Sequence, residues 1–191
     1  MNIVFATANP HKLEEVKSIC CDDNFNFILP AEGFNPVENG LTFEENSLIK
    51  ANEAYRVSKT YCLADDSGLC VEALNGAPGL YSARYAGTQD EKIEKLLNEL
   101  SGVTNRKAYF VCCMTLLDEK GDILFQTKGK CHGSIVTERK GINGFGYDPI
   151  FLVDGYSKTM AELSSDEKNK ISHRAVALNN VIDFLKTFNF N

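Results

Sequence analysis

Hydrophobic residues in the first third of the chain alternate between short continuous runs and a helical repeat. Residues 2–7 (NIVFAT) form an apolar run typical of a buried strand, and the next segment predicts a helix from about Pro10 to Cys21. Residues 42–61 predict the clearest helix of this part, because apolar side chains recur at helical spacing and Thr42 with Glu45 forms a capping box.

The remainder of the chain mixes strands and helices in the same way. Two apolar segments predict a β-hairpin across the DEKGD turn, and the C-terminal segment predicts a helix with candidate N-caps at Ser164 and Ser172. This mixed order predicts an α/β or α+β fold with a mixed sheet. The expected elements are a strand at 62–74, a helix at 89–100, the hairpin strands at 108–117 and 122–130, an apolar stretch at 149–153 and a helix over 164–188.

The composition predicts a cytoplasmic globular protein with one domain spanning residues 1–191. The chain carries 20 Lys and Arg against 26 Asp and Glu, and this acidic balance argues against a broad nucleic-acid-binding face, which needs clustered positive charge. Its 7 Cys include no Cys-x-x-Cys pair, so we expect reduced thiols. The first residues lack a basic leader, and no segment approaches the roughly 18 apolar residues of a membrane span. We therefore expect neither nucleic acid nor a membrane as a partner.

Residues 7–12 (TANPHK) place a small-residue turn between the first strand and its helix, with Lys12 in the first helical turn. A helix start offers free backbone N–H groups and a partial positive charge, which suit a phosphate group. The P-loop pattern G-x-x-x-x-G-K-[ST] is absent from the sequence. The alternative is an ordinary turn between a strand and a helix.

Carboxylates form a second candidate site, with Glu44 and Glu45 at a helix start and Asp65-Asp66-Ser67-Gly68 within a predicted strand. Charged pairs in an apolar strand are costly to bury unless a cation or another partner compensates them. Mg²⁺ commonly takes one or two carboxylates, several waters and phosphate oxygens, so this set suits Mg²⁺. The alternatives are a helix cap for Glu45 and a solvated turn for the DDSG segment.

Residues 144–151 (GFGYDPIF) combine two glycines with aromatic residues. Glycines let the backbone approach a ligand closely, and an aromatic ring offers a stacking surface for a nucleobase. The alternative is a tight turn whose aromatic residues lie in the core.

A basic cluster near the C-terminus contains Lys168, Lys170, His173 and Arg174. If Ser172 caps a helix, the first turn of that helix presents His173 and Arg174 as donors for a phosphate or a carbonyl oxygen. The alternative is a solvated face, since acidic residues are mixed with the basic ones.

Taken together, these segments resemble a known family. TANPHK, TFEENSLIKA, LADDSGL, GAPGLYSARYAG, GFGYDPIF and KNKISHRA are similar, in the same order, to segments of the inosine/xanthosine triphosphate pyrophosphatases. The resemblance implies an elongated mixed β-sheet flanked by helices, with two lobes, an active-site cleft between them, and usually a homodimer. It also implies that ITP, dITP and XTP are hydrolysed to the monophosphate and pyrophosphate with Mg²⁺, which cleanses the nucleotide pool.

The resemblance also implies roles for single residues. Asp66 matches the proton acceptor, which is also a metal ligand, and Glu45 matches a second metal-associated carboxylate. Ala8 stands where many members have Gly. The residues that match substrate contacts are Thr7, Ala8, Asn9, Pro10, His11 and Lys12 at the triphosphate, Ser67, then Phe145, Gly146, Tyr147 and Asp148 at the base, and Lys168, His173 and Arg174 from the C-terminal side.

In this interpretation, Asp66 or Asp65 orients or deprotonates a water molecule aimed at the α-phosphorus, with Mg²⁺ near Glu45 and Asp66. Arg174 or His173 would donate to the 6-oxo group of hypoxanthine or xanthine and would meet the 6-amino donor of adenine. The alternatives are a Maf-like pyrophosphatase acting on pyrimidine or modified nucleotides, a nucleotide sensor without turnover, and a purely structural α/β protein.

Overall fold

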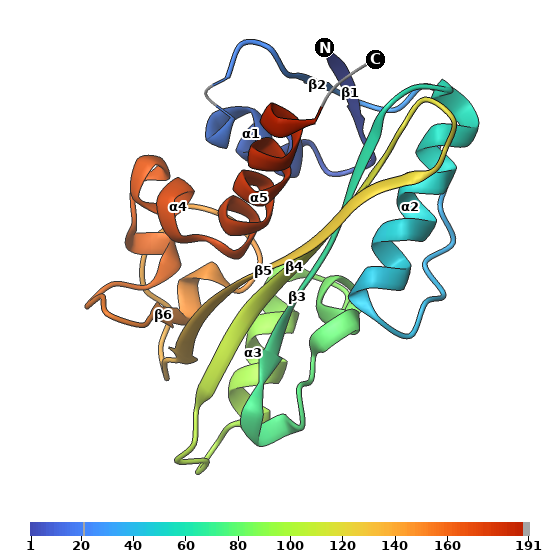
Figure 1. The fold of residues 1–191 in the computed structure, drawn as a ribbon. Coiled ribbons are helices and arrows are strands. Elements are labelled where there is room, and N and C mark those ends of the chain that lie inside the picture. The colour runs from blue at the N-terminus through green and yellow to red at the C-terminus, as the bar shows by residue number, and fades with distance from the viewer. Residues whose placement is uncertain (21, 189–191) are drawn as a thin grey trace. The chain divides into compact units, whose positions relative to one another are not determined.

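Six strands form one mixed sheet in the order β2-β1-β3-β4-β5-β6 in this computed structural model, which describes residues 1–20 and 22–188 (Figure 1). β1 pairs in parallel with β2 and β3, and β5 pairs antiparallel with β6. The predicted α/β fold with a mixed sheet and flanking helices is confirmed. The strands and helices are β1 (Asn2–Phe5), α1 (Pro10–Ile19), β2 (Asn26–Ile28), α2 (Phe43–Ser58), β3 (Cys62–Val71), α3 (Gln89–Glu99), β4 (Lys107–Leu117), β5 (Ile123–Ile135), β6 (Phe151–Val153), α4 (Ser165–Ile171) and α5 (His173–Thr187), with short 3₁₀ turns at Glu72–Leu74, Gly79–Arg84, Asp148–Ile150 and Met160–Glu162.

The described residues divide into two compact units. The first unit comprises residues 1–66, 112–129 and 173–188, and the second comprises residues 67–111 and 130–172. β3, β4 and β5 each contribute one segment to either unit.

The alternating side chains of β1 and β3 give the first unit a core on each face of its strands. Ile3, Phe5 and Leu63 pack in one cluster with α1, α5 and side chains of β4. Val4 and Ala64 belong to another cluster, which includes the alanines of α2. Because successive strand residues point to opposite faces, α1 and α5 cover one face of these strands and α2 covers the other (Figure 1).

The second unit has a core of its own around α3. Ile93 of α3 is buried in one cluster with Phe110 of β4 and Phe151 of β6, whose ring centroids lie 4.5 Å apart. α3 begins with a capping box in which the Thr88 N–H donates to Glu91 Oε2 at 2.8 Å and Thr88 Oγ1 accepts from the Glu91 N–H at 3.2 Å. The helix predicted at residues 89–100 is therefore confirmed.

Several boundaries differ from the sequence expectation. α1 ends at Ile19, and Cys21, its expected end, lies outside the described residues. α2 ends at Ser58, because Lys59 adopts the left-handed conformation with φ 52°. β3 ends at Val71, where a 3₁₀ turn begins. The expected C-terminal helix is two helices, since Ser172 between α4 and α5 has extended backbone at ψ 152°.

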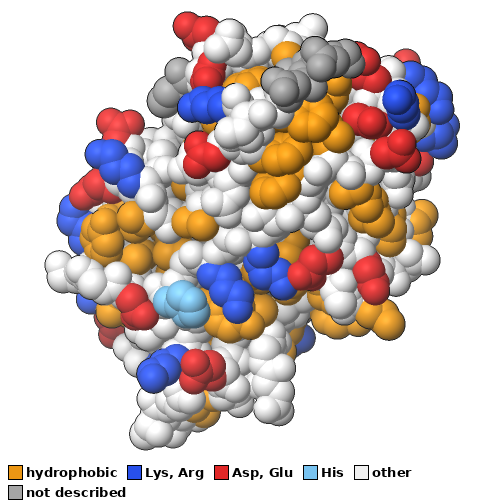
Figure 2. Space-filling view, viewed as in Figure 1, with side chains coloured by type: hydrophobic (Ala, Val, Ile, Leu, Met, Phe, Trp, Pro, Cys, Tyr) orange, Lys and Arg blue, Asp and Glu red, His pale blue; other side chains and the backbone are white. Residues whose placement is uncertain are grey.

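Acidic and basic side chains intermingle, with hydrophobic side chains between them, on the face of the molecule shown in Figure 2. The described side chains form no continuous basic area on that face. None of the helices in the described part of the chain has the length and hydropathy that a membrane span requires.

Candidate functional site

Asp65 and Asp66 lie in the middle of β3, just after the segment that pairs with β1. The Ala6 N–H donates to Leu63 O at 2.8 Å, two residues before Asp65. By strand alternation, Asp65 points to the face covered by α1 and α5, and Asp66 to the face covered by α2. Both are buried, with 1% and 7% of their surface exposed. The DDSG segment is a continuous part of the strand, so its interpretation as a solvated turn is wrong.

On the α2 face, one buried ammonium group joins two carboxylates. Lys50 Nζ donates to Asp66 Oδ1 at 2.9 Å and to Glu38 Oε2 at 3.2 Å. Lys50 comes from α2, whereas Glu38 comes from the loop that precedes that helix. The three formal charges sum to one negative charge, which would complement an additional cation.

The pKa values of Asp66 and Lys50 are both raised, for different reasons. Burial raises the pKa of Asp66 above its usual range, and the ammonium of Lys50 opposes that effect only in part. Burial tends to lower the pKa of Lys50, but Asp65, Asp66 and Glu38 outweigh it and raise that pKa. Lys50 is therefore charged at neutral pH, and Asp66 is a stronger base than an ordinary aspartate.

On the α1 and α5 face, Asp65 contacts two cations. Lys12 Nζ donates to Asp65 Oδ1 at 3.0 Å, and the Arg174 guanidinium donates to Asp65 Oδ2 at 3.0 Å. Arg174 also forms an ion pair with Glu15 of α1. The thiol of Cys112 lies 4.0 Å from Asp65 Oδ2. These contacts join β3 to α1 and α5.

Arg174 is buried among acidic partners. Only 2% of its surface is exposed. Burial opposes its charge, but Asp65 and Glu15 more than compensate and raise its pKa. His173, the preceding residue, is also buried. The sequence predicts that the first turn of this helix presents His173 and Arg174 as donors, but both side chains are buried at the start of α5.

The N-terminus of α1 has the local structure that the sequence predicts. Asn9 is the N-cap, with Oδ1 accepting from the His11 N–H at 3.0 Å, and Pro10 occupies the first turn. Thr7 Oγ1 accepts from the Asn9 N–H at 3.0 Å, which orders the turn. Among the described residues other than glycine, Lys59 and Asn75 have a positive φ. Ala8 is not one of them, so its position does not require the conformational freedom of glycine.

The two glutamates at the start of α2 have local partners. Thr42 Oγ1 accepts from the Glu45 N–H at 3.1 Å, as predicted. The Glu45 carboxylate is exposed and accepts from the Leu41 N–H at 2.6 Å, so the expected return bond to Thr42 is replaced by one to the preceding residue. Glu44 pairs with Lys128 of β5.

Glu38, which the sequence reasoning missed, is the carboxylate that shares Lys50 with Asp66. Glu15 was missed in the same way, although it lies only three residues after Lys12. Neither residue belongs to a motif with a chemical signature. Their roles in the clusters depend on which helix packs on which face of the sheet.

In the second unit, Phe145, Asp148 and Lys168 form a compact polar and aromatic cluster. Asp148 Oδ2 accepts from the Phe145 N–H at 3.0 Å and from Lys168 Nζ at 2.7 Å. Lys168 Nζ also lies 5.1 Å from the centroid of the Phe145 ring. Gly144 has φ +74°, and a Cβ there would lie 2.0 Å from Asp148 Oδ2, so this turn requires glycine.

Neighbouring residues hold this turn in place. Tyr147 is buried and its hydroxyl donates to Ser82 O at 3.2 Å. The Gln89 side chain, at the start of α3, donates to Gly146 O. Ser67, also in this unit, is half-buried in β3. The structure thus brings together the predicted base-binding segment and Lys168.

The donor chemistry around Asp66 fits Mg²⁺. Asp66 and Glu38 offer oxygen ligands only, and Mg²⁺ takes one or two carboxylates and completes its shell with water and phosphate oxygens. Clusters of three or more His, Cys, Asp or Glu side chains suited to a metal are absent from the described residues. Asp66 and Glu38 could therefore form a Mg²⁺ site with only two protein ligands.

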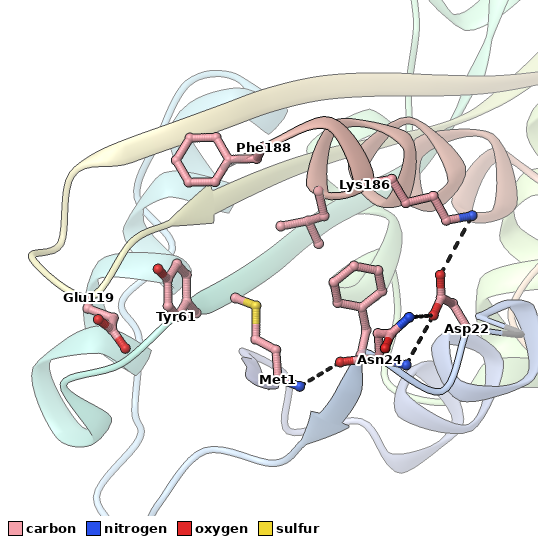
Figure 3. A pocket seen from close by; sticks show the side chains of 9 residues that line it. Met1, Asp22, Asn24, Tyr61, Glu119, Lys186 and Phe188 are labelled. Atoms are coloured by element: carbon pink, nitrogen blue, oxygen red, sulfur yellow. Dashed lines mark hydrogen bonds and ion pairs between the residues drawn. The ribbon is translucent and has the colours of Figure 1, made fainter. Parts of the chain in front are cut away.

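A separate hollow of about 700 Å³ opens in the first unit near the chain ends (Figure 3). Phe25, Tyr61 and Leu185 contribute apolar surface, and Asp22 with Lys186 forms an ion pair 3.7 Å long. None of the predicted site residues lines this hollow.

The chain is similar in sequence and in fold to several known proteins. Two dITP/XTP pyrophosphatases are similar over nearly their full length: that of Clostridium perfringens is 47% identical, with 96% of each chain covered, and that of Treponema denticola is 46% identical, with 97% of this chain and 99% of the relative covered. The solved HAM1 protein of Coxiella burnetii superposes with a TM-score of 0.89 at 41% identity, covering 98% of this chain and 100% of that one. The Ham1 protein of Staphylococcus aureus superposes with a TM-score of 0.87 at 43% identity, covering 97% and 98%. The model of the Ham1 family matches residues 3–184, and the chain belongs to this family.

Proposed function

We propose that this chain hydrolyses the non-standard purine nucleotides ITP, dITP and XTP to the nucleoside monophosphate and pyrophosphate, with Mg²⁺. The observation that carries the proposal is the buried Asp66, paired with Lys50 at 2.9 Å beside the carboxyl end of β1. Relatives named dITP/XTP pyrophosphatase, similar over nearly the whole chain, support the choice of substrate.

In the proposed reaction, Asp66 accepts a proton from a water molecule. The water oxygen bonds to the α-phosphorus, the bond from that phosphorus to the bridging oxygen breaks, and pyrophosphate leaves. Lys50 holds Asp66 Oδ1 in place, and the raised pKa of Asp66 favours proton transfer. A Mg²⁺ ion held by Asp66 and Glu38 would neutralise charge on the phosphate oxygens.

The family resemblance implies Glu45 as the second metal-associated carboxylate, but the geometry favours Glu38. Glu38 shares Lys50 with Asp66, whereas the Glu45 carboxylate caps the backbone at Leu41. We assign the second metal-associated carboxylate to Glu38, and Glu45 is the alternative that the Mg²⁺ titration described in the Discussion tests.

The N-terminus of α1 is the proposed site of the triphosphate. It combines the Asn9 cap with Lys12, whose side chain is 18% exposed. Backbone N–H groups and the helix dipole favour an anion here. Thr7, Ala8, Pro10 and His11 shape the turn that carries these groups.

The cluster of Phe145, Asp148 and Lys168 is the proposed site of the base. The Phe145 ring provides a stacking surface, and the Lys168 ammonium, held by Asp148, is a donor for a 6-oxo group. Adenine presents a 6-amino donor instead, which leaves the ammonium poorly matched. The nitrogens of Arg174 contact Glu15 and Asp65, so we assign Arg174 to holding the site together.

The function is tested by pyrophosphate release from ITP, dITP, XTP, GTP, ATP, dTTP and UTP, with Mg²⁺ and with EDTA. We expect rapid release from the first three nucleotides, loss of activity in EDTA, and a loss of at least about 1000-fold in kcat for Asp66→Asn. Asp183→Asn, at an exposed position of α5, is the matched control. Preference for dTTP or UTP would favour a Maf-like activity, and binding of ITP without release would favour a sensor.

We further propose that the enzyme works in the cytoplasm as a homodimer. The seven cysteines, which include no Cys-x-x-Cys pair, fit a reducing compartment, and the family resemblance supports the dimer. Light scattering coupled to size-exclusion chromatography would measure the mass in solution, and a mass of one chain would contradict the dimer.

A further inference from the structure

Asp65 and Asp66 are neighbours in sequence, but their side chains contact different residues. Asp66 faces α2 and Lys50, whereas Asp65 faces α1 and α5 and contacts Lys12 and Arg174. The alternation of a strand produces this separation, because adjacent side chains point to opposite faces. A water molecule held by Asp66 therefore lies on the other side of β3 from the Asp65 carboxylate.

The two cations on Asp65 differ in their exposure. The Arg174 side chain is 2% exposed and is fixed by a second ion pair with Glu15. The Lys12 side chain is 18% exposed and comes from the first turn of α1, next to the proposed triphosphate site. Arg174 is therefore a static partner of Asp65, and Lys12 is the partner that can reach a ligand.

We propose that Asp65 is a positioning residue that holds the Lys12 ammonium at the N-terminus of α1, ready to bind the triphosphate. This inference rests on the proposed function. Lysine has one of the largest side-chain entropies of any residue, and the contact with Asp65 restricts that freedom before the substrate arrives. Lys12 keeps some exposure to solvent while Asp65 is buried, so the Lys12 ammonium can contact a ligand from its place beside Asp65. Asp65 takes no proton from the attacking water.

The test is a double-mutant cycle between Lys12→Met and Asp65→Asn. We expect each substitution alone to raise KM for ITP by about tenfold while kcat changes less than about threefold. If Asp65 acts through Lys12, the double variant raises KM by about tenfold rather than about hundredfold. Multiplicative effects, or a loss of kcat in Asp65→Asn as large as that in Asp66→Asn, would overturn the proposal.

Two additions keep the result interpretable. Asp65→Glu retains the charge opposite Arg174 and moves it by one methylene group, so it replaces Asp65→Asn if that variant does not fold, with the same expected division between KM and kcat. Asp183→Asn controls for the loss of one acidic charge, and we expect it to leave KM unchanged.

Binding of inorganic tripolyphosphate, measured by calorimetry, separates this inference from the proposed function. We expect Lys12→Met, Asp65→Asn and the double variant to weaken binding by similar factors of about ten. If the native enzyme releases no pyrophosphate from any nucleotide, the proposed function fails and the binding cycle still decides the role of Asp65. Unchanged binding in Asp65→Asn would overturn the inference even if turnover of ITP is rapid.

Discussion

Lys50 Nζ lies 2.9 Å from Asp66 Oδ1, and both side chains are buried. The same ammonium lies 3.2 Å from Glu38 Oε2, so α2 and the loop before it are joined to β3 through one cation. Buried ion pairs contribute little net stability, but removal of one partner leaves an uncompensated charge. The arrangement therefore orients Asp66 and makes the site depend on Lys50.

Lys50→Met should destabilise the protein at pH 7 by about 3–5 kcal/mol, because Asp66 and Glu38 lose their shared cation. The pKa of Asp66 should rise further, so the folded state would bind protons more readily than the unfolded state. The loss of stability should consequently shrink as pH falls from 7 towards 5. Urea denaturation at several pH values measures this, and a deficit that does not depend on pH would contradict the prediction.

Glu38→Gln and Glu45→Gln should differ in their Mg²⁺ requirement. Glu38 shares a cation with Asp66. Glu38→Gln should therefore raise the Mg²⁺ concentration needed for half-maximal activity by at least about 10-fold. Glu45 caps the backbone of Leu41, so its variant should lose only about 1 kcal/mol of stability. Titration of activity with Mg²⁺ distinguishes them, and the reverse order would place Glu45 at the metal.

The acidic limb of kcat/KM should lie above the pH of about 4 at which an exposed aspartate titrates, since burial raises the pKa of Asp66. In the proposed reaction the deprotonated form of Asp66 accepts a proton, so activity should fall as pH drops through this raised pKa. The proposed Mg²⁺ ion would bind that same form, and higher Mg²⁺ should therefore move the limb to lower pH. Profiles at two Mg²⁺ concentrations test this, and a limb that stays in place would separate Asp66 from the metal.

Arg174→Ala should destabilise the fold by about 3–5 kcal/mol, because it removes the guanidinium that the buried Asp65 shares with the partly buried Glu15. Thermal or urea denaturation measures the effect. Arg139→Ala, which breaks an exposed pair with Asp90, is the matched control and should cost less than about 1 kcal/mol. Equal losses of stability in the two variants would contradict the prediction, because the buried ion pairs of Arg174 would then contribute no more than the exposed pair.

The thiols of Cys113 and Cys131 should resist alkylation in the folded protein. Burial raises the pKa of Cys113 to about 12 and that of Cys131 to about 11. At pH 8 the thiolate fractions are then about 10⁻⁴ and 10⁻³, and the thiolate is the reactive form. Iodoacetamide labelling followed by peptide mass spectrometry should modify Cys20, which is partly exposed, well before either. Rapid labelling of Cys113 would contradict its burial.

Much of the fold could be predicted from local signals. The capping box of Thr88 and Glu91 marks the start of α3. The DEKGD turn joins β4 to β5 within a residue of the expected strand ends on its two sides, although β5 runs on to Ile135, five residues past its expected end at residue 130. The break at Ser172 was visible only as a second candidate cap. Its extended backbone ends α4, and helical periodicity alone does not reveal it, because apolar residues continue on both sides.

The sequence by itself determined the family, the order of the elements and the chemical character of the site, because its motifs and their spacing are local properties of the chain. Only the tertiary structure decided which charges meet. The alternation of β3 sends Asp65 to Lys12 and Arg174 and sends Asp66 to Lys50 and Glu38. Those partners come from helices and a loop far away in sequence, and the packing of each helix on one face of the sheet selects them, since a buried charge is stable only where an opposite charge is within reach.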